Sequence, residues 1–409
     1  MQYLNKKQFE RGILLQLREA VIVAPVRTPV GRCGGVLAQV PAYKLGAAVI
    51  KETIVRSGID PLEIDDVIMG NLFSFDVANM ARMCVLEAGL PVQVPGLTVD
   101  RQCSSALNAI MLAAALVMGG FGDVYIAGGA ESDSQRPYAM ERADKAYKVQ
   151  TAPKFFGVQV SPPQIGNPPM GITAENIADL YGITRSEMDE FAYSSHLKAL
   201  AAVARGAFDE QIVPIMIPQR KGDPMMVHQD ECPRPNISMD ALSSLKPAFK
   251  QGGTVTAGNS SPMNDGASAC VVMSREKAEE MGLDWMLKFK AYAVAALDPN
   301  YMGLGPIHST RKLLRQTGAS IKEFDTLELN EAFAAQSIAC IRDLGFDIKK
   351  VNMNGGAIAL GHPLAATGGV LTAKLAYLMR EQELKNGLIS FCCGGGQGVT
   401  AWFEARPRF

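Results

Sequence analysis

The chain has 409 residues, of which 48% are hydrophobic and 20% are charged, and its formal net charge is −1. A chain of this length can hold two or three units of ordinary domain size around a large apolar core. The nearly balanced charge provides no global field that would attract nucleic acid or an anionic membrane surface. No apolar run reaches the ~18–20 residues that a membrane span needs.

Residues 1–18 differ from the rest of the chain. Their apolar residues fall on one face of a helical wheel, whereas the basic residues lie elsewhere. The segment lacks the apolar core and the cleavage site of a signal peptide. Glu10 and the lack of serine weigh against a mitochondrial presequence. We therefore interpret residues 1–18 as an N-terminal extension, either a short docking helix or a non-native remnant.

Strands and helices alternate from residue 20 onward. Short apolar runs predict strands, and longer stretches with helical periodicity predict helices. The helix that begins after Cys103 is apolar on nearly all sides, which predicts that it is buried. In chain order we expect a strand at 20–25, a helix at 42–57 that ends at Gly58, strands at 64–71 and 98–102, a helix at 104–118 and a strand at 124–130.

The second half of the chain repeats this plan. Residues 324–331 resemble 64–71, a small-residue helix is expected at about 365–380, and residues 388–396 resemble 124–130. Only two copies exist, so we expect two similar α/β halves rather than a solenoid. Alternation of strands with helices predicts largely parallel sheets.

Residues 134–250 separate the two halves and are rich in proline and charge. One helix is expected to open near Thr173, and Thr184 with Glu187 has the spacing of a capping box. We interpret this region as an inserted loop domain over the active face, after which strands at 254–257 and 267–273 return to the first half. The predicted division is therefore 1–18, 19–133 with 251–285, 134–250, and 286–409.

The eight cysteines show no paired Cys-x-x-Cys spacing, which argues against zinc ribbons and disulfide frameworks. A reducing compartment fits this pattern best, and we expect a cytoplasmic protein. Cys103 stands out because it lies at the start of the helix at 104–118. The positive end of a helix dipole stabilises a thiolate, the nucleophilic form of cysteine. A buried structural cysteine is the alternative interpretation of this position taken alone.

Two further segments carry groups that could assist a nucleophile. His362 lies between a glycine and a proline, on a loop where an imidazole can accept a proton from a thiol. Asn330 follows a predicted strand, where its amide can orient water or donate to an oxyanion, or can cap a helix. The other histidines, at positions 196, 228 and 308, are interpreted as ordinary structural or surface residues.

A third segment places Cys392 and Cys393 directly before three glycines. Gly394 and the glycines after it are not a phosphate loop, because no GxGxxG or GxxxxGK[ST] pattern stands in a suitable context. Glycines at a strand end can expose amide hydrogens to a ligand. The segment therefore suits a second reactive sulfur beside an oxyanion site, or alternatively a tight turn with two core cysteines.

Six motifs occur together in an order that resembles the thiolase family over about residues 19–405. They are VDRQCSS (99–105), PMGITAEN (169–176), TAGNSSPMNDGAS (256–268), NEAFA (330–334), GGAIALGHP (355–363) and CCGGGQG (392–398). The resemblance implies the five-layered thiolase fold, with two βαβαβαββ halves packed on paired central helices and an inserted loop domain.

The resemblance also implies a role for each candidate residue. Cys103 is then the cysteine that becomes acylated, His362 is its activating base, and Cys392 is the second cysteine that shuttles a proton. Asn330 then holds a water in one oxyanion hole that it shares with His362. The amides of Cys103 and Gly394 then form the other oxyanion hole.

Contacts to coenzyme A follow from the same resemblance. Ser261 is similar to a pantetheine contact, and Arg220 is expected near the nucleotide end of coenzyme A. Met170 and Phe333 are expected to line the substrate site. Coenzyme A and acyl-CoA are then the substrates, no tightly bound cofactor or metal is expected, and the protein is expected to be a homodimer or homotetramer.

The activity implied is thiolytic cleavage of 3-ketoacyl-CoA to acyl-CoA plus acetyl-CoA, or the reverse Claisen condensation of acetyl-CoA, in fatty acid metabolism. Pro169 stands where biosynthetic acetoacetyl-CoA thiolases usually carry histidine, which slightly favours a degradative or broad enzyme. A β-ketoacyl synthase would carry two active-site histidines and no counterpart of Cys392. A catalytically idle scaffold would not need Cys103, His362 and Cys392 to be intact.

Overall fold

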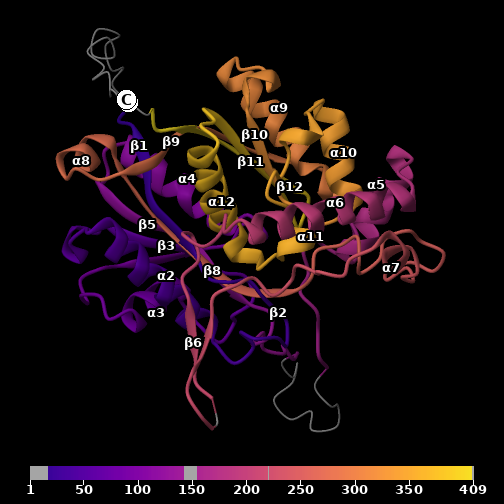
Figure 1. Cartoon of the computed structure of the whole chain (residues 1–409), viewed down its shortest axis with the longest axis horizontal. Helices are drawn as coiled ribbons and strands as arrows, with labels where there is room; N and C mark the ends of the chain where they lie inside the picture. Colours follow the sequence, from indigo (N-terminus) through magenta and orange to yellow (C-terminus); the bar gives the residue numbers. More distant parts are fainter. Residues whose placement is uncertain (1–16, 142–153, 220, 408–409) are drawn as a thin grey trace, which may run out of the picture.

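The computed structural model describes residues 17–141, 154–219 and 221–407 of the chain. Most of the predicted N-terminal extension thus lies outside the described residues. The described part is built around one mixed ten-stranded sheet (Figure 1). Its strands are β1 (Ala20–Arg27), β2 (Gly31–Arg32), β3 (Asp66–Gly70), β4 (Gly96–Val99), β5 (Val124–Ser132), β8 (Asn264–Ser274), β9 (Trp285–Ala296), β10 (Thr326–Leu329), β11 (Asn386–Cys393) and β12 (Gln397–Ala405).

The strand order shows an internal duplication. The N-terminal half runs β1-β8-β5-β3-β4 and the C-terminal half runs β9-β12-β11-β10. In each half the first two pairings are antiparallel and the third is parallel. The counterpart of β4 is reduced to one parallel bridge between Leu327 and Val351. The halves join where β1 pairs with β9, so the prediction of two similar α/β halves is confirmed.

The prediction of largely parallel sheets is wrong. Among the described strands, only β3–β4, β3–β5 and β10–β11 are parallel pairs. The chain turns directly from β11 into β12 at Gly394–Gly396, and strands joined by so short a turn must be antiparallel. Strand β8 likewise runs antiparallel to both of its long neighbours, β1 and β5.

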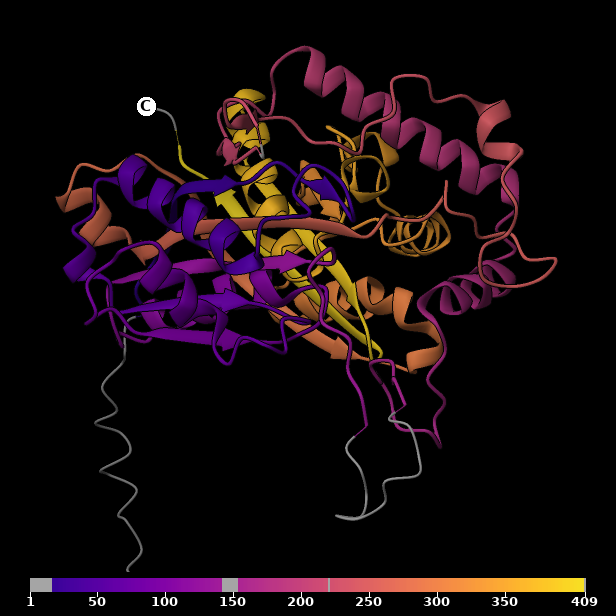
Figure 2. The ribbon, with the colours of Figure 1, turned by 90° about the horizontal axis from the view of Figure 1, so that it is seen from below.

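The fold has five layers, because three layers of helices alternate with the two halves of the sheet (Figures 1 and 2). Helices α2 (Ala42–Ser57) and α3 (Met80–Glu87) cover the outer face of the N-terminal half. Helices α9 (Gly305–Thr317) and α10 (Ala334–Leu344) cover the outer face of the C-terminal half. Between the halves, α4 (Ser105–Met118) packs against α12 (Thr367–Glu381). The predicted burial of the helix after Cys103 is thus confirmed.

The helices between β5 and β8 lie over the C-terminal half, where α5 contacts α10 and α6 contacts α10 and α11 (Ala357–Leu360), whereas β6 and β7 pack with the core of the N-terminal half. The predicted capping box is present: the Thr184 side chain accepts from the Glu187 amide, and the Glu187 carboxylate accepts from the Thr184 amide. The described elements of this segment are α5 (Met170–Tyr181), α6 (Arg185–Ala204), β6 (Ile215–Ile217), β7 (Met225–Val227) and α7 (Met239–Ser243).

The strand predicted at 254–257 does not form. The backbone N–H groups of Thr254 and Val255 donate to the buried carboxylate of Glu175, at 2.8 to 3.0 Å. A side chain thus satisfies the donors that a neighbouring strand would otherwise have to satisfy. Among the described residues, no helix combines the length and apolarity needed to cross a membrane.

A buried ion pair fastens the segment after α6 to the first strand. Arg27 at the end of β1 forms two parallel contacts with the Asp230 carboxylate, at 2.7 and 2.8 Å. Its Nε also donates to Gln211, and its guanidinium lies over the ring of Phe208. Both charged side chains are only 1% exposed, so the pair depends on its full set of partners for stability.

Candidate active site

Cys103 lies immediately before the N-cap residue of α4, as the sequence predicts. Strand β4 ends at Val99, however, and not at residue 102 as expected. Gln102 has a φ of +49°, a left-handed conformation that is uncommon for a residue with a side chain. The backbone N–H of Gln102 donates to the Asp100 carboxylate at 2.6 Å, which stabilises the turn. This turn brings the Cys103 sulfur to the start of the central helix.

The charge state of Cys103 differs from the expectation of a stabilised thiolate. Burial raises the pKa of the thiol to about 11, and Glu131 and Asp100 contribute in the same direction. The nearby backbone N–H groups of Gly394 and of Cys103 itself lower the pKa, but the effect of desolvation is larger. The side chain is therefore a thiol at neutral pH and needs a base before it can attack.

His362 is buried between three groups that fix its ring and its backbone. Its Nδ1 is 2.7 Å from the Thr367 hydroxyl, and that hydroxyl donates to the Pro363 carbonyl. Because the hydroxyl has one hydrogen, Nδ1–H must be the donor and Nε2 carries no proton. The backbone N–H of His362 donates to Asn264 at 2.7 Å. Burial lowers the pKa of His362 to about 3, so at neutral pH the ring is a neutral base.

Asn330 lies directly after β10 and faces the free nitrogen of this ring. Its Nδ2 is 3.2 Å from His362 Nε2, and its backbone N–H donates to Ser390 on β11 at 2.9 Å. Its Oδ1 is buried and has no hydrogen-bond partner among the described residues. A buried acceptor of this kind fits the predicted role of holding a water molecule.

The two central helices bring the Cys103 and His362 segments to the same end of the molecule. Gly368 at the start of α12 packs on the backbone of Leu107 in α4, and an added Cβ would lie 2.1 Å from the Leu107 nitrogen. The loop after His362 also packs on β5, where an added Cβ on Gly129 would lie 2.2 Å from the Ala365 carbonyl oxygen. These close contacts explain why the segment after His362 is built from small residues.

Cys392 and Cys393 end β11 and point into different parts of the core. Cys392 packs among the apolar residues beneath α9 and α10, together with Phe333. Cys393 packs among those around α4 and α12, and its sulfur donates to the Ser104 hydroxyl at 3.1 Å. Burial and the neighbouring Cys103 sulfur raise the pKa of both thiols, that of Cys393 to about 12. Both side chains therefore hold a proton at neutral pH.

The residues expected to contact coenzyme A fall into two groups. The backbone N–H of Ser261 donates to the carbonyl of Ala332, the residue before Phe333. The Phe333 ring packs edge-on against that of Phe249, with ring centroids 6.1 Å apart. Met170 begins α5 and packs against the same apolar cluster as Phe333. Ser261, Met170 and Phe333 thus lie close to the Asn330 segment. Arg220 lies outside the described residues.

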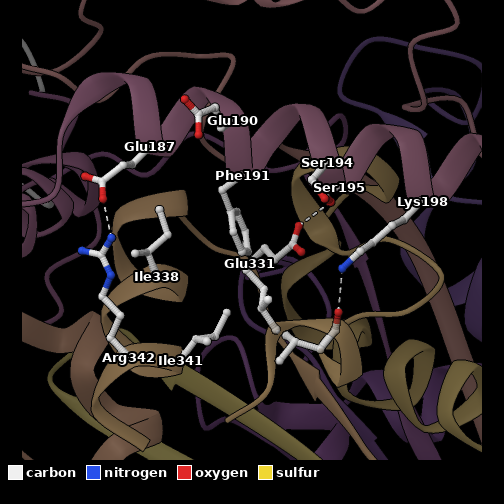
Figure 3. Close-up of a pocket in the computed structure, with 12 residues that line it drawn as sticks. Glu187, Glu190, Phe191, Ser194, Ser195, Lys198, Glu331, Ile338, Ile341 and Arg342 are labelled. Atoms are coloured by element: carbon white, nitrogen blue, oxygen red, sulfur yellow. Dashed lines mark hydrogen bonds and ion pairs between the residues drawn. The ribbon is translucent and has the colours of Figure 1, made fainter. Parts of the chain in front are cut away.

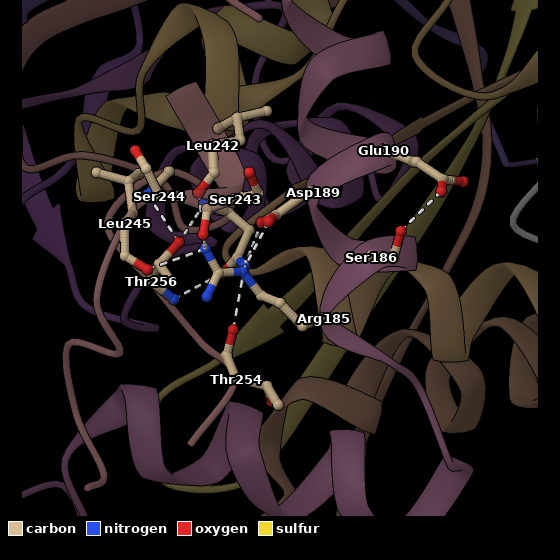
Figure 4. A network of polar contacts seen from close by, with 12 residues as sticks. Arg185, Ser186, Asp189, Glu190, Leu242, Ser243, Ser244, Leu245, Thr254 and Thr256 are labelled. Atoms are coloured by element: carbon tan, nitrogen blue, oxygen red, sulfur yellow. Dashed lines mark hydrogen bonds and ion pairs between the residues drawn. The ribbon is translucent and has the colours of Figure 1, made fainter. Parts of the chain in front are cut away.

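A polar network holds the segment that leads to Ser261 (Figure 4). Arg185 on α6 donates to Asp189 at 2.7 Å and to the carbonyls of Leu242 and Leu245. Asp189 in turn accepts from the Asn259 amide at 2.9 Å. Helix α6 and the end of α7 are therefore tied to the loop that carries the predicted pantetheine contact.

Sequence reasoning missed several supporting residues. Thr367 and Asn264 fix the ring and the backbone of His362, and Phe249 packs on Phe333. Thr367 had a local signal, since a hydroxyl five residues after His362 at a helix start can reach back to the imidazole. Asn264 and Phe249 had none, because they are about 100 and 80 residues away from the groups that they contact.

Comparison with known proteins gives consistent matches over almost the whole chain. Residues 20–276 match the model of the thiolase N-terminal domain, and residues 283–405 match that of the thiolase C-terminal domain. An acetyl-CoA acetyltransferase of Cupriavidus necator is 44% identical over 95% of this chain and 100% of its own length. A probable acetyl-CoA acyltransferase of Staphylococcus epidermidis is 43% identical over 93% of this chain and 97% of its own.

A solved structure shows the same architecture. The crystal structure of the Bacillus anthracis acetyl-CoA acetyltransferase superposes with a TM-score of 0.91 at 42% sequence identity. The match covers 96% of this chain and 100% of that one. The duplicated halves and the central helix pair described above therefore agree with a fold determined by experiment.

Proposed function

The chain belongs to the thiolase family, and we propose how its residues carry out the reaction of that family. The protein is an acyltransferase that moves an acyl group to coenzyme A through an acyl-cysteine, by thiolytic cleavage of a 3-ketoacyl-CoA or by the reverse Claisen condensation. The observation that supports our assignment best is the position of the Cys103 sulfur, at the start of α4 and close to the backbone N–H groups of Cys103 itself and of Gly394.

In the first step, the Cys103 sulfur attacks the keto carbon of the substrate while its proton passes to His362. Nε2 of the neutral ring is the nitrogen without a proton, so it is the acceptor. The keto oxygen becomes an oxyanion, and hydrogen-bond donors fixed before the reaction stabilise it. We assign one set of donors to the amides of Cys103 and Gly394, and the other to Asn330 and His362 with a bound water.

The second step breaks the bond between the keto carbon and its neighbour. The acyl group stays on Cys103, and acetyl-CoA leaves as an enolate that takes the proton of Cys392. Burial keeps Cys392 protonated and so available as an acid. An incoming coenzyme A thiol then gives its proton to the Cys392 thiolate and attacks the acyl-cysteine. The Cys103 thiolate leaves and regains its proton from His362, which restores every group.

We further propose that Ser261, Met170 and Phe333 contact the pantetheine and acyl portions, and that Arg220 contacts the nucleotide end. Support comes from the position of the first three beside the Asn330 segment. The similarity to the acetyl-CoA acetyltransferase of Cupriavidus necator favours acetyl transfer, whereas Pro169 before Met170 favours a broader range of 3-ketoacyl chains. We propose no tightly bound cofactor and a role in fatty acid metabolism.

We propose that two or four copies assemble. Strand β4 forms one edge of the sheet and pairs only with β3 among the described strands. Leu97 on this strand and Met83 and Leu86 on the neighbouring α3 are exposed apolar side chains. An apolar edge strand favours pairing with a second copy. We also propose that the chain divides as predicted, with residues 134–250 as an inserted loop domain between the two halves. Because the eight cysteines form no disulfide, we propose a cytoplasmic location.

The test is a direct assay of the purified protein with acetoacetyl-CoA and coenzyme A, with acetyl-CoA quantified by chromatography. We expect the wild-type protein to form acetyl-CoA and the Cys103→Ala variant to form none. A series of 3-ketoacyl-CoA substrates from short to long then determines chain-length preference. An inactive wild-type protein, or an active Cys103→Ala variant, would refute the proposed mechanism.

A further inference from the structure

Glu331 is a buried carboxylate next to Asn330 that the mechanism above does not use. Its Oε2 accepts from the Ser195 hydroxyl at 2.7 Å and from the Ile358 N–H at 3.2 Å. Its Oε1 accepts from the Asn352 amide at 2.7 Å. Three hydrogen bonds to one buried carboxylate are enough to offset much of its desolvation.

The three donors come from separate segments of the chain. Ser195 belongs to α6, in the segment between the two halves, and Figure 3 shows its contact with Glu331. Ile358 belongs to α11, the short helix that leads to His362. The Asn352 side chain also accepts from the backbone N–H of Leu329, the last residue of β10, and donates to its carbonyl. Glu331 therefore connects the strand that carries Asn330 to the loop that carries His362.

The glycines before α11 provide the space for this arrangement. A Cβ on Gly356 would lie 2.0 Å from the carboxyl carbon of Glu331. The Gly356 N–H donates to the Ser195 hydroxyl at 3.0 Å, so Ser195 receives one hydrogen bond and gives another to Glu331. Gly355 has a φ of +79°, and a Cβ there would meet Ser195 and Ala199 of α6. The glycine pair thus lets the His362 loop close around the carboxylate.

Charged groups around Glu331 reinforce the connection. Lys374 on α12 bonds the buried Glu328 carboxylate at 2.8 Å and the Gly355 carbonyl at 2.6 Å. Lys198 on α6 donates to the Val351 carbonyl at 2.9 Å. Burial lowers the pKa of Lys198 and raises that of Glu328. The network therefore spans α6, β10 and α12, all of which position catalytic segments.

One face of Glu331 lines a cavity of about 350 Å³ between α6 and α10 (Figure 3). Its wall is mostly apolar, and Lys198 and Ser195 line it from α6. None of Cys103, His362, Cys392 and Asn330 lines this cavity. Glu331 is therefore in contact with a space separate from the proposed reaction site, while its backbone neighbour Asn330 faces His362.

We propose that Glu331 is a positioning residue, which holds Asn330 and His362 in the relative placement that proton transfer and oxyanion stabilisation need. The inference rests on the proposed function, because it acts through those two groups. Its physical basis is that the 3.2 Å contact between Asn330 and His362 joins two loops. A displacement of about 1 Å in such a contact costs about a hundredfold in rate.

The test uses Glu331→Gln in the full-length protein, with Glu190→Gln as the matched control. Glutamine has the same shape, but its NH₂ group cannot accept a hydrogen bond, so at least one of the three donors loses its partner. Glu190 lines the same cavity and bonds Ser186 on its own helix. We expect Glu331→Gln to lower kcat about ten- to hundredfold with KM changed less than about threefold, and Glu190→Gln to behave as wild type.

A second measurement separates positioning from simple loss of folded protein. In the wild type, iodoacetamide should alkylate Cys103 at a rate that depends on His362, and Glu331→Gln should slow this rate by the same factor as kcat. An unchanged alkylation rate and kcat per folded molecule in Glu331→Gln would overturn the proposal. If Glu331→Gln does not fold, Ser195→Ala decides, because it keeps the carboxylate and removes one donor. We expect a smaller fall in kcat for Ser195→Ala, and no fall would overturn the proposal.

The wild-type protein distinguishes this proposal from the proposed function. Wild-type protein without thiolase activity, or a His362→Ala variant with unchanged activity, would refute the assigned mechanism. An active wild type, an impaired His362→Ala and an unimpaired Glu331→Gln would leave the mechanism intact and refute only the role of Glu331.

Discussion

Cys392 and Cys393 are adjacent in β11 but belong to two different apolar clusters on opposite faces of the sheet. Successive side chains of a strand point to opposite faces, so the two thiols have different surroundings although both lie near the Cys103 sulfur. Cys393 is bonded to Ser104, whereas no hydrogen bond from the Cys392 sulfur is present among the described residues. The two thiols thus differ in their contacts, and the resemblance to the thiolase motif selects Cys392 as the proposed proton carrier.

The first prediction follows from this difference. We expect Cys392→Ser to lose most thiolytic and condensing activity, because a hydroxyl has a far higher pKa than a thiol and is a poor acid–base group at neutral pH. We expect Cys393→Ser to keep most activity. Steady-state assays of both variants test this, with circular dichroism to confirm folding. An inactive Cys393→Ser beside an active Cys392→Ser would show that the two roles are assigned the wrong way round.

The second prediction concerns the covalent intermediate. After incubation with acetyl-CoA, mass spectrometry should find an acetyl group on the peptide that contains Cys103, because its sulfur lies at the start of α4 and close to the Gly394 N–H. The Cys103→Ala variant is the control and should carry no adduct. An adduct confined to Cys392 or Cys393 would contradict the assignment of the nucleophile.

The third prediction concerns the base. We expect His362→Ala to slow acylation of Cys103 by roughly 10²–10⁴-fold, the range for loss of a positioned general base. Because burial raises the pKa of Cys103 to about 11 and lowers that of His362 to about 3, the neutral pair persists across neutral pH. The alkylation rate of the wild type should therefore be nearly constant between about pH 5 and 9.

The His362→Ala variant should behave differently in the same experiment. Without the base, reaction depends on the thiolate fraction, so the alkylation rate should rise about tenfold per pH unit below the thiol pKa. A wild-type rate that also rises tenfold per unit would show that His362 does not activate Cys103.

The fourth prediction concerns stability and pH. His196 on α6 is 3% exposed, and burial lowers its pKa to about 4 from an ordinary value near 6.5. Below pH 6.5 the unfolded chain binds a proton that the folded protein does not. The stability that this neutral histidine provides is therefore present above pH 6.5 and lost as pH falls toward 4.

At pH 5 the loss amounts to about 2 kcal/mol. His196→Gln removes this pH dependence, so the stability difference between wild type and variant should be about 2 kcal/mol smaller at pH 5 than at pH 7.5. Urea unfolding at both pH values measures it. Equal differences at the two pH values would show that His196 has an ordinary pKa in the folded protein.

The fifth prediction concerns the ion pair that fastens the segment after α6 to β1. Asp230→Ala leaves the buried Arg27 charge without its carboxylate and should cost about 3–5 kcal/mol in the free energy of unfolding. The control is Asp284→Ala, whose pair with Arg406 lies at the surface and should be worth about 0–1 kcal/mol. Similar losses in both variants, measured by urea unfolding, would contradict a special role for burial.

Local sequence signals determined much of this protein. The capping box of Thr184 and Glu187 and the helix end at Gly58 depend on residues only a few positions apart, and both are present in the structure. The motifs around Cys103, His362 and Cys392 each sit at a strand or helix end, and that placement could be predicted because periodicity and turn residues mark such ends. The family follows from the combination of these motifs.

Tertiary structure alone decided the strand directions, the charge states and the supporting contacts. The expectation of a Cys103 thiolate followed from the helix start, but desolvation by distant segments is larger and keeps the thiol protonated. Glu331 receives bonds from Ser195 and Ile358, residues that are 136 and 27 positions away along the chain. Burial and long-range hydrogen bonds depend on which segments meet in space, and neither periodicity nor spacing along one chain encodes that meeting.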